Sequence, residues 1–259
     1  MKLKFYKYQG TGNDFVMVDN RSKTFPVTNT SLVKRLCDRK FGIGADGLIL
    51  LEEDATTDFK MVYFNSDGNE STMCGNGGRC LVAFANKLGV INNNATFNAI
   101  DGLHYAEVAD DVVSLQMIDV DAVNIEETHT FLNTGSPHHV QLVANLTEYD
   151  VFSNGKAIRN GSPYFEEGTN VNFVEKMSDD TFAVRTYERG VEDETLSCGT
   201  GVTAVALAMY ANQQTTKNAV NLETPGGTLT VSFEQDGTTY KNIFLKGKAT
   251  FVFEGEIEC

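Results

Sequence analysis

Two stretches of the chain share one order of hydrophobic and polar positions. Residues 59–64 (FKMVYF) and 182–187 (FAVRTY) alternate apolar and polar positions and contain the β-branched and aromatic residues typical of strands. A polar loop and the pattern Cys-Gly-x-Gly follow each run, and residues 81–88 and 204–210 then carry Ala, Leu and Val at helical spacing. Each stretch therefore predicts a strand, a loop and a helix that starts at a cysteine.

The two stretches are in register along the chain. Cys74 and Cys198 are 124 positions apart, and the glycines that follow them keep the same offset. Weaker landmarks elsewhere, such as the Thr-Gly pairs at 11–12 and 134–135, keep a similar one. Matches spread over most of a chain are typical of an internal duplication.

We therefore expect two domains, residues 1–122 and 123–259. A chain of 259 residues has room for two domains of ordinary size. The boundary falls in the acidic stretch 119–130, which has no clear periodicity. The last strand is a candidate to pack back on the N-terminal half.

The remaining pattern predicts mostly strands. A helix is expected over residues 29–40. The glycine-rich turn at 9–14 would bring backbone close to a neighbour, but an ordinary hairpin connection is the preferred interpretation of this turn. The expected strands are residues 3–8, 15–18 and 48–51, two or three strands within 95–117, and several within 219–254.

Composition narrows the functional classes. With 41% hydrophobic and 10% aromatic residues, each half can build a core. The chain has 21 Lys and Arg against 35 Asp and Glu, a net charge of −14, and no basic cluster, which disfavours nucleic acids and anionic membranes as partners. The longest aliphatic run, 48–51, is too short to span a bilayer, and the N-terminus does not read as a signal peptide. A cytoplasmic protein is expected.

The cysteines indicate thiol chemistry rather than disulfides or metal. Five is an odd number in a chain without a secretory signal. No CxxC pair occurs, and Cys74 and Cys80 are six positions apart with no histidine beside them, so no metal site is expected. For Cys37, Cys80 and Cys259 a structural role is the simpler interpretation.

A cysteine at the start of each of two helices suits proton transfer at carbon. The unpaired N–H groups of a helix start favour a thiolate or a carboxylate. Epimerisation removes a proton from one face of a carbon and returns one to the other, which needs two opposed acid/base groups, and a duplicated half with one thiol per copy supplies them. Such a reaction requires no cofactor, and no nucleotide-binding fingerprint is present. Two structural cysteines would explain either copy alone, but not their recurrence in register.

These motifs resemble those of the diaminopimelate epimerase family over essentially the whole chain. The resemblance implies an α/β (α+β) fold of two similar, pseudo-symmetric domains, each a curled, mostly antiparallel sheet around a central helix. It also implies a site in the cleft between them, a homodimer, and cofactor-independent conversion of LL- to meso-2,6-diaminopimelate on the route to lysine and peptidoglycan. The strings that carry it are Gly10–Phe15, Asn65–Gly68, Met73–Cys80, Tyr187–Gly190 and Cys198–Gly201.

The resemblance also assigns roles to single residues. Cys74 and Cys198 resemble the two acid/base thiols, with His138 assisting the first and Glu188 the second. The residues that resemble those holding the reacting carboxylate are Gly75, Asn76, Gly199 and Thr200. Those that resemble the set recognising the rest of the substrate are Asn13, Asn65, Asn170 and Arg189.

Two departures and two alternatives remain. Some family members have glutamine where this chain has Gly47, and many have asparagine where it has Ser136, which puts contacts at those positions in doubt. A related two-thiol racemase acting on proline or hydroxyproline would also use opposed cysteines, but the amide and arginine set is large for so small a ring. A non-catalytic binding protein or thiol redox sensor would show thiol oxidation without turnover.

Overall fold

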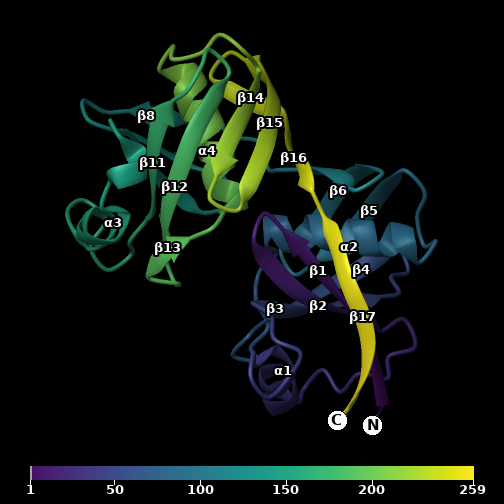
Figure 1. The fold of residues 1–259 in the computed structure, drawn as a ribbon. Coiled ribbons are helices and arrows are strands. Elements are labelled where there is room, and N and C mark those ends of the chain that lie inside the picture. The colour runs from purple at the N-terminus through teal and green to yellow at the C-terminus, as the bar shows by residue number, and fades with distance from the viewer. Residues whose placement is uncertain (1) are drawn as a thin grey trace. The chain divides into compact units, whose positions relative to one another are not determined.

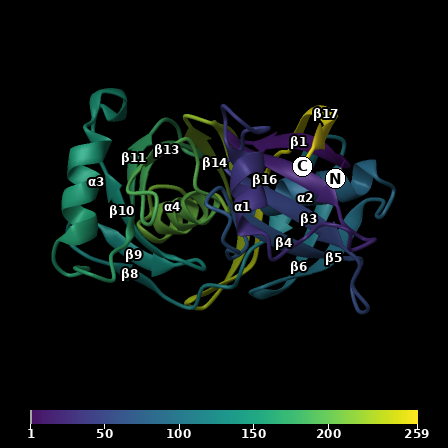
Figure 2. The ribbon, with the colours of Figure 1, turned by 90° about the horizontal axis from the view of Figure 1, so that it is seen from below.

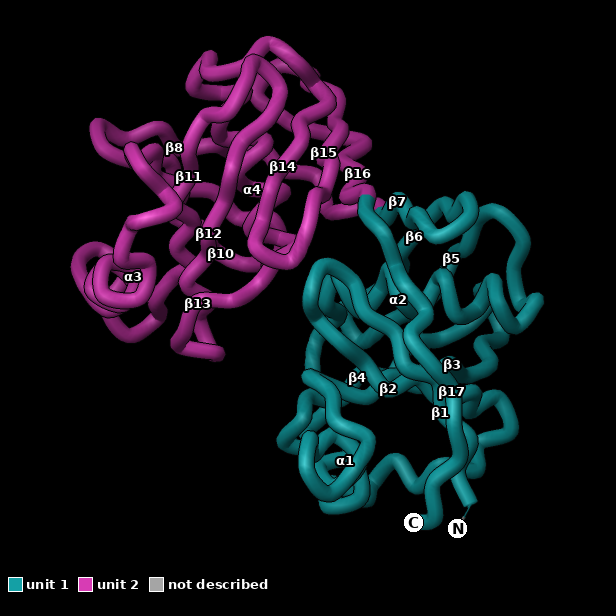
Figure 3. The backbone as a smooth tube through the Cα atoms, in the orientation of Figure 1, with its two compact units in different colours: residues 1–115, 247–259 teal, residues 116–246 magenta. Residues whose placement is uncertain are grey.

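The computed structural model describes residues 2–259 (Figure 1). The chain divides into two compact units, residues 1–115 with 247–259, and residues 116–246 (Figure 3). We call them unit 1 and unit 2. No helix in the described part of the chain is long and apolar enough to cross a membrane.

Unit 1 is a curled sheet around helix α2 (Gly75–Lys87). Eleven consecutive residues of α2, from Gly75 to Ala85, are buried, because strands contact the helix on several sides. A shorter helix, α1 (Thr30–Cys37), packs on β3. The strands, in order across the sheet, are β17 (Thr250–Glu258), β1 (Lys2–Gly10), β2 (Asn13–Asp19), β3 (Gly47–Glu52), β4 (Phe59–Asn65), β5 (Asn94–Ala99), β6 (Gly102–Ala109) and β7 (Val112–Gln116).

Unit 2 has the same plan around helix α4 (Gly199–Ala211). This helix is apolar on all sides, as a helix enclosed by a sheet must be, and Figure 2 shows it nearly end-on with strands around it. The outer helix α3 (Val151–Asn160) follows the short 3₁₀ turn η1 (Leu146–Glu148), and β13 (Asp193–Thr195) pairs with the end of β12. The strands, in order across the sheet, are β8 (Val123–Ile125), β9 (Thr130–Asn133), β10 (Pro137–Leu142), β11 (Asn170–Lys176), β12 (Thr181–Glu188), β14 (Ala219–Thr224), β15 (Gly227–Asp236) and β16 (Thr239–Lys248).

The two sheets repeat the same pairing directions. From one edge to the other, neighbouring strands are antiparallel, antiparallel, parallel, antiparallel, parallel, antiparallel and antiparallel in both units. Residue register agrees as well, because Phe15 lies opposite Gly47 in unit 1, and His138 opposite Asn170 in unit 2, each 123 positions later. The helices α2 and α4 have the same length of 13 residues. Both units therefore follow one architecture, of the mixed, mostly antiparallel kind that the resemblance implied.

In both units, the strand that follows the last strand of the sheet in sequence pairs within the other unit. Strand β8 follows β7 in sequence but pairs with β9 of unit 2, and β17 follows β16 but pairs with β1 of unit 1. The compact units change over at residues 115 and 116, and residues 247–259 belong to unit 1. The domain division at residues 122 and 123 stays a prediction.

The local patterns predicted most elements and missed two features. The strands and cysteine helices of both repeats are confirmed. The helix expected over 29–40 is wrong in its second part: it ends at Cys37, since Asp38 adopts an extended conformation and the chain turns back so that the Ile43 N–H donates to the Leu36 carbonyl. Helix α3 was not predicted. Its central Gly155 lowers helix propensity, yet it is needed because a Cβ there would lie 2.4 Å from Cβ of Tyr187.

Candidate active site

The first half-site lies at the start of α2 in unit 1. Cys74 is the N-cap residue, with extended backbone angles (φ −103°, ψ 129°), and is partly exposed. The next two residues, Gly75 and Asn76, are buried. Their N–H groups belong to the first turn, where the helix offers N–H groups without intrahelical acceptors, so a thiolate or a carboxylate is stabilised there.

The turn between β1 and β2 brings Asn13 to this helix start. Asn76 Nδ2 donates to Asn13 Oδ1 at 2.9 Å, and Asn13 Nδ2 in turn donates to Asp46 Oδ2 at 2.7 Å. The orientation of both amides is therefore set by a carboxylate that can only accept. The structure thus brings three predicted residues together, Cys74, Asn76 and Asn13.

An ionic cluster stabilises the carboxylate that orients Asn13. Arg39 Nη2 donates to Asp14 Oδ1 at 2.7 Å and to Asp46 Oδ1 at 2.8 Å, and the buried Lys7 lies 2.6 Å from Asp14 Oδ2. Burial alone would raise the pKa of Asp14, but the hydrogen bonds and charges of Arg39 and Lys7 outweigh it and lower that pKa to about 2. Sequence reasoning missed this cluster, and the Gly-Ala-Asp loop ending at Asp46 was its only local signal.

The loop end of β4 holds another predicted residue, Asn65. It lies directly opposite Gly47 in the antiparallel pair β3–β4. A Cβ at Gly47 would lie 2.5 Å from Cε2 of Tyr63 and 2.6 Å from the carbonyl oxygen of Phe64. The departure at position 47 therefore has a packing reason, because the neighbouring strand leaves no room for a side chain.

The second half-site lies at the start of α4 in unit 2. Cys198 is the N-cap residue (φ −120°, ψ 115°) and is buried. Its Sγ lies 3.5 Å from Oγ1 of Thr200, and the Thr200 hydroxyl lies 3.0 Å from Nε2 of His138. Thr134 Oγ1 donates to the Thr200 carbonyl at 2.8 Å and steadies the turn. A continuous line of contacts therefore joins His138 to the second thiol.

The neighbours of His138 decide which ring nitrogen carries its proton. Asn172 Nδ2 donates to the His139 carbonyl and lies 3.1 Å from His138 Nδ1, while Asn172 Oδ1 accepts from the Thr186 hydroxyl. The amide group facing Nδ1 is thus a donor, so Nδ1 accepts and the proton is on Nε2. Burial, together with the charge of Arg189, lowers the pKa of His138 to about 3. The neutral ring donates to Thr200, whose hydroxyl can then donate to Cys198.

Asn170 organises the remaining predicted residues of unit 2. Its Nδ2 donates to Ser136 Oγ at 2.9 Å and to the Pro137 carbonyl at 3.0 Å, and its Oδ1 accepts from the Arg189 N–H at 2.9 Å. Glu188, the last residue of β12, immediately precedes Arg189 and is partly exposed. The departure at Ser136 therefore keeps a hydrogen bond within the half-site.

Asn172 is the functional neighbour that sequence reasoning missed in unit 2. It is fully buried and makes the contact that sets the ring of His138. Its two-residue spacing from Asn170 places both side chains on one face of β11. That spacing was the available signal.

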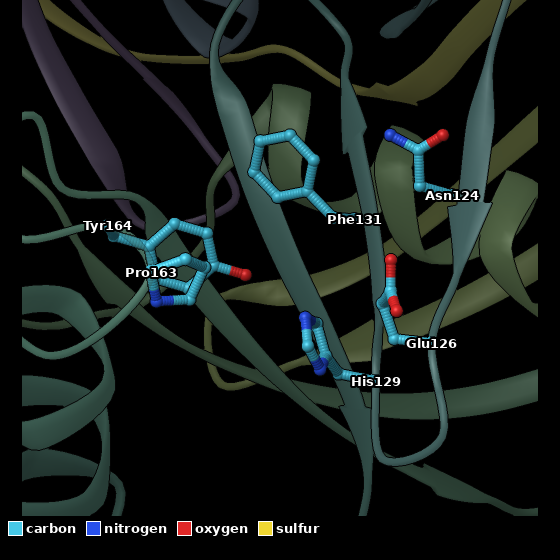
Figure 4. A pocket seen from close by; sticks show the side chains of 6 residues that line it. All are labelled: Asn124, Glu126, His129, Phe131, Pro163 and Tyr164. Carbon is cyan, nitrogen blue, oxygen red and sulfur yellow. The ribbon is translucent and has the colours of Figure 1, made fainter.

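Two further observations concern other kinds of site. A cavity of about 500 Å³ in unit 2 contains none of the predicted site residues (Figure 4); it is lined by Asn124, Glu126, His129, Phe131, Pro163 and Tyr164. Among residues 2–259, no group of three or more His, Cys, Asp and Glu side chains could hold a metal ion.

Solved structures of other proteins share this fold. A phenazine biosynthesis protein of the PhzF family from Bacillus anthracis aligns with a TM-score of 0.76 at 15% identity, covering 100% of both chains. A hydroxyproline epimerase from Agrobacterium vitis aligns with a TM-score of 0.69 at 15% identity, covering 99% of this chain and 92% of its own. At such identities these likenesses define the fold alone.

Sequence comparison defines the family. The family model described as diaminopimelate epimerase matches residues 5–122 and 130–252. A diaminopimelate epimerase of Flavobacterium psychrophilum is 61% identical over 256 residues, which cover 98% of this chain and 100% of that protein. The one of Aquifex aeolicus is 41% identical over 275 residues and covers 98% of each chain. The chain belongs to the diaminopimelate epimerase family, so the predicted family is confirmed.

Proposed function

We propose that this protein is an isomerase that converts LL-2,6-diaminopimelate to meso-2,6-diaminopimelate in lysine biosynthesis, using two thiols and no cofactor. Membership of the family supports the reaction and its substrate. The observation that carries the mechanism is the recurrence of a cysteine at the N-cap of an enclosed helix in two units of equal architecture. A single structural cysteine would need no such recurrence.

The proposed step is a proton exchange at the α-carbon. In one direction the Cys74 thiolate takes the α-proton, and the Cys198 thiol gives its own proton to the opposite face, which leaves Cys74 as the thiol and Cys198 as the thiolate. The reverse reaction swaps these roles. Negative charge that develops next to the carboxylate is stabilised by N–H groups at the two helix starts, Gly75–Asn76 and Gly199–Thr200.

His138 and Glu188 are proposed to assist the thiols. The resemblance pairs His138 with Cys74 and Glu188 with Cys198, and that pairing stays a prediction. The contacts within unit 2 support a link from His138 through Thr200 to Cys198, because a neutral ring donating to Thr200 leaves the threonine proton available to the sulfur. Such a link would stabilise the Cys198 thiolate that forms once Cys198 has given up its proton.

The remaining polar residues are proposed to recognise the distal amino acid end of the substrate. Asn13 is held by Asp46, and Asn170 is held between Ser136 and the Arg189 backbone, so each amide is oriented before substrate arrives. Asn65 and the Arg189 side chain complete the set. An arginine fork suits a carboxylate, and several amides can distinguish an amine from an acid by hydrogen bonding.

A homodimer is proposed from the surface of β17. Its residues Phe251, Val252 and Phe253 are exposed although apolar, and β17 lies at the edge of the unit 1 sheet. Exposed apolar edge strands favour pairing with another chain. Val252→Lys should lower the mass measured by light scattering from that of two chains to one; an unchanged mass places the contact elsewhere. A cytoplasmic location also stays a prediction.

Proton NMR of the reduced protein in D₂O tests the reaction and the substrate together. With LL-diaminopimelate we expect loss of the α-proton signal and appearance of the meso isomer, and with L-proline no exchange. Exchange into proline would keep the two-thiol chemistry but overturn the substrate. Exchange into neither substrate would favour a binding or redox protein.

A further inference from the structure

Arg79 is a fully buried charge in the second turn of α2, and its guanidinium has no counter-ion in the described part of the chain. It is the largest of the fully buried side chains. Nη2 donates to Thr11 Oγ1 at 3.1 Å and to Asn76 Oδ1 at 3.0 Å, both neutral oxygens. Among the described residues, Nε and Nη1 have no hydrogen-bond partner. Removing an ion from water costs several kcal/mol unless another charge compensates it, so the lack of a carboxylate needs an explanation.

The guanidinium lies at the start of the helix rather than beside it. Helical side chains tilt toward the N-terminus, and Arg79 contacts Asn76, the second residue of α2, and Thr11 in the turn after β1. Gly10 of β1 packs closely against this part of α2, since a Cβ there would lie 3.2 Å from Cys80 Sγ, 3.3 Å from the Asn76 carbonyl oxygen and 3.4 Å from Nη2 of Arg79. The charge therefore adds to the positive end of the helix, at the place where Cys74 caps it.

The titratable groups around Arg79 leave Cys74 as the group that can carry the compensating charge. Burial lowers the pKa of Arg79, and the neighbouring groups that would raise it when ionised are the thiols of Cys80 and Cys74. Burial raises the pKa of Cys80 to about 12, so Cys80 stays a neutral thiol near pH 7. From the packed strand β1, Tyr8 faces Cys80, and burial raises its pKa too, so it is neutral as well. Arginine itself stays protonated in proteins.

The equivalent helix of unit 2 has no such charge. The position 124 residues later is Thr203, which is also fully buried and donates to the Gly199 carbonyl at 2.9 Å. In unit 2 the thiol of Cys198 contacts the Thr200 hydroxyl, which contacts His138, and both groups are neutral. A buried positive charge therefore lies near Cys74 but not at the equivalent position near Cys198, although both cysteines cap helices of the same architecture.

We propose that Arg79 is a positioning residue that holds Asn76 toward Asn13 and keeps Cys74 as the resting thiolate, while Cys198 rests as the thiol. The functional meaning of this asymmetry rests on the proposed two-thiol reaction. It makes Cys74 the base that meets the substrate in one direction, and it lets the buried charge act on an anion only 5 residues away on the same helix.

Alkylation of the intact protein tests the proposal without turnover. Iodoacetamide labelling of Cys74 and Cys198, followed by peptide mass spectrometry from pH 5 to 9, gives the midpoint of each pH profile. In the unmodified protein the midpoint of Cys74 should lie below that of Cys198. Arg79→Gln should move the Cys74 midpoint up by about 1 pH unit or more, the effect of losing an opposite charge nearby, and leave Cys198 in place.

Two variants separate charge from packing. Arg79→Lys keeps the charge but not the fork, so the Cys74 midpoint should stay low while the KM for diaminopimelate rises through the loosened Asn76. Thr203→Val, the matched change in α4, should leave the Cys74 midpoint unchanged. If Arg79→Gln does not fold, the two midpoints in the unmodified protein still test the proposal, because a Cys74 midpoint equal to or above that of Cys198 would overturn it.

Each outcome bears on one idea. A Cys74 midpoint equal to or above that of Cys198, or unmoved in folded Arg79→Gln, overturns the role of Arg79 even if Cys74→Ala is inactive. Conversely, full epimerisation by Cys74→Ala would overturn the proposed mechanism and leave a measured midpoint shift intact.

Discussion

Helices α2 and α4 occupy the same place in two sheets of the same strand order, yet the side chains around their N-cap cysteines differ. At the helix start capped by Cys74, the buried guanidinium of Arg79 donates to Asn76, and hydrogen bonds lead from Asn76 through Asn13 to Asp46. Next to Cys198 are the hydroxyl of Thr200 and, beyond it, the neutral ring of His138. The backbone follows one plan around both thiols, and the side chains on it make one half-site ionic and the other neutral. Under the proposed reaction, this difference would give the two thiols different resting protonation on equivalent backbones.

The largest test of this comparison removes the thiols. Cys74→Ala and Cys198→Ala should each lower kcat for epimerisation by about 10²- to 10⁴-fold, the usual contribution of a general acid or base. Both variants should unfold at close to the unmodified temperature by circular dichroism. Cys259→Ala, which changes a terminal cysteine, is the control and should keep full activity. Comparable turnover by either thiol variant would rule out a two-base reaction.

The neutral histidine of unit 2 predicts a dependence of stability on pH. The pKa of His138 is lowered to about 3 in the folded protein, against about 6.5 in an unfolded chain, so its stabilisation is present above pH 6.5 and is lost as the pH falls toward 3. The loss is up to about 1.4 kcal/mol per pH unit. In urea titrations between pH 7 and 5, His138→Gln should have a smaller pH slope of the free energy of unfolding.

His139→Gln is the matched control for that variant. Burial, with the charge of His129, lowers the pKa of His139 to about 4, so this variant should also lose part of the pH slope. The His139 ring does not contact Thr200 in the described structure, so only His138→Gln should lower epimerisation as well. An unchanged slope in His138→Gln would contradict a buried neutral ring.

The two units also differ in packing at position 47. Gly47 and Asn170 are equivalent in register, but only unit 2 has room for a side chain there. Gly47→Gln should lower the free energy of unfolding by about 1 to 3 kcal/mol through overpacking against Tyr63 and Phe64. Thermal unfolding measures it, and adding Tyr63→Ala should recover part of the loss. A fully stable Gly47→Gln would show that the strand yields at this point.

The smallest expected effects concern the groups that orient the two recognition amides. Asp46→Asn weakens the acceptor of Asn13 and should raise KM about fivefold, as the loss of about 1 kcal/mol does. Ser136→Ala should raise KM less, because Asn170 keeps the Pro137 carbonyl. Arg21→Met, which removes the ion pair to Asp19 and no contact of Asn13 or Asp46, is the control. A fall in kcat at constant KM would argue against a binding role.

The sequence by itself determined the elements whose signal is local. The alternating runs before each cysteine, the Cys-Gly-x-Gly helix starts and their common offset are short-range patterns, so the strands, the cysteine helices and the family followed from them. Helix α3 escaped because its Gly155 weakens the local signal, and its reason, contact with Tyr187, is distant in sequence.

Only the tertiary structure decided which side chains surround each thiol. An arginine on a helix is expected at the surface, and nothing local shows that Arg79 is buried against Thr11, 68 positions away. Likewise His138 meets Thr200 across 62 positions, and its tautomer depends on Asn172 in a neighbouring parallel strand. Charge and protonation depend on desolvation and on partners brought together by folding, whereas helix and strand patterns depend on neighbours along the chain.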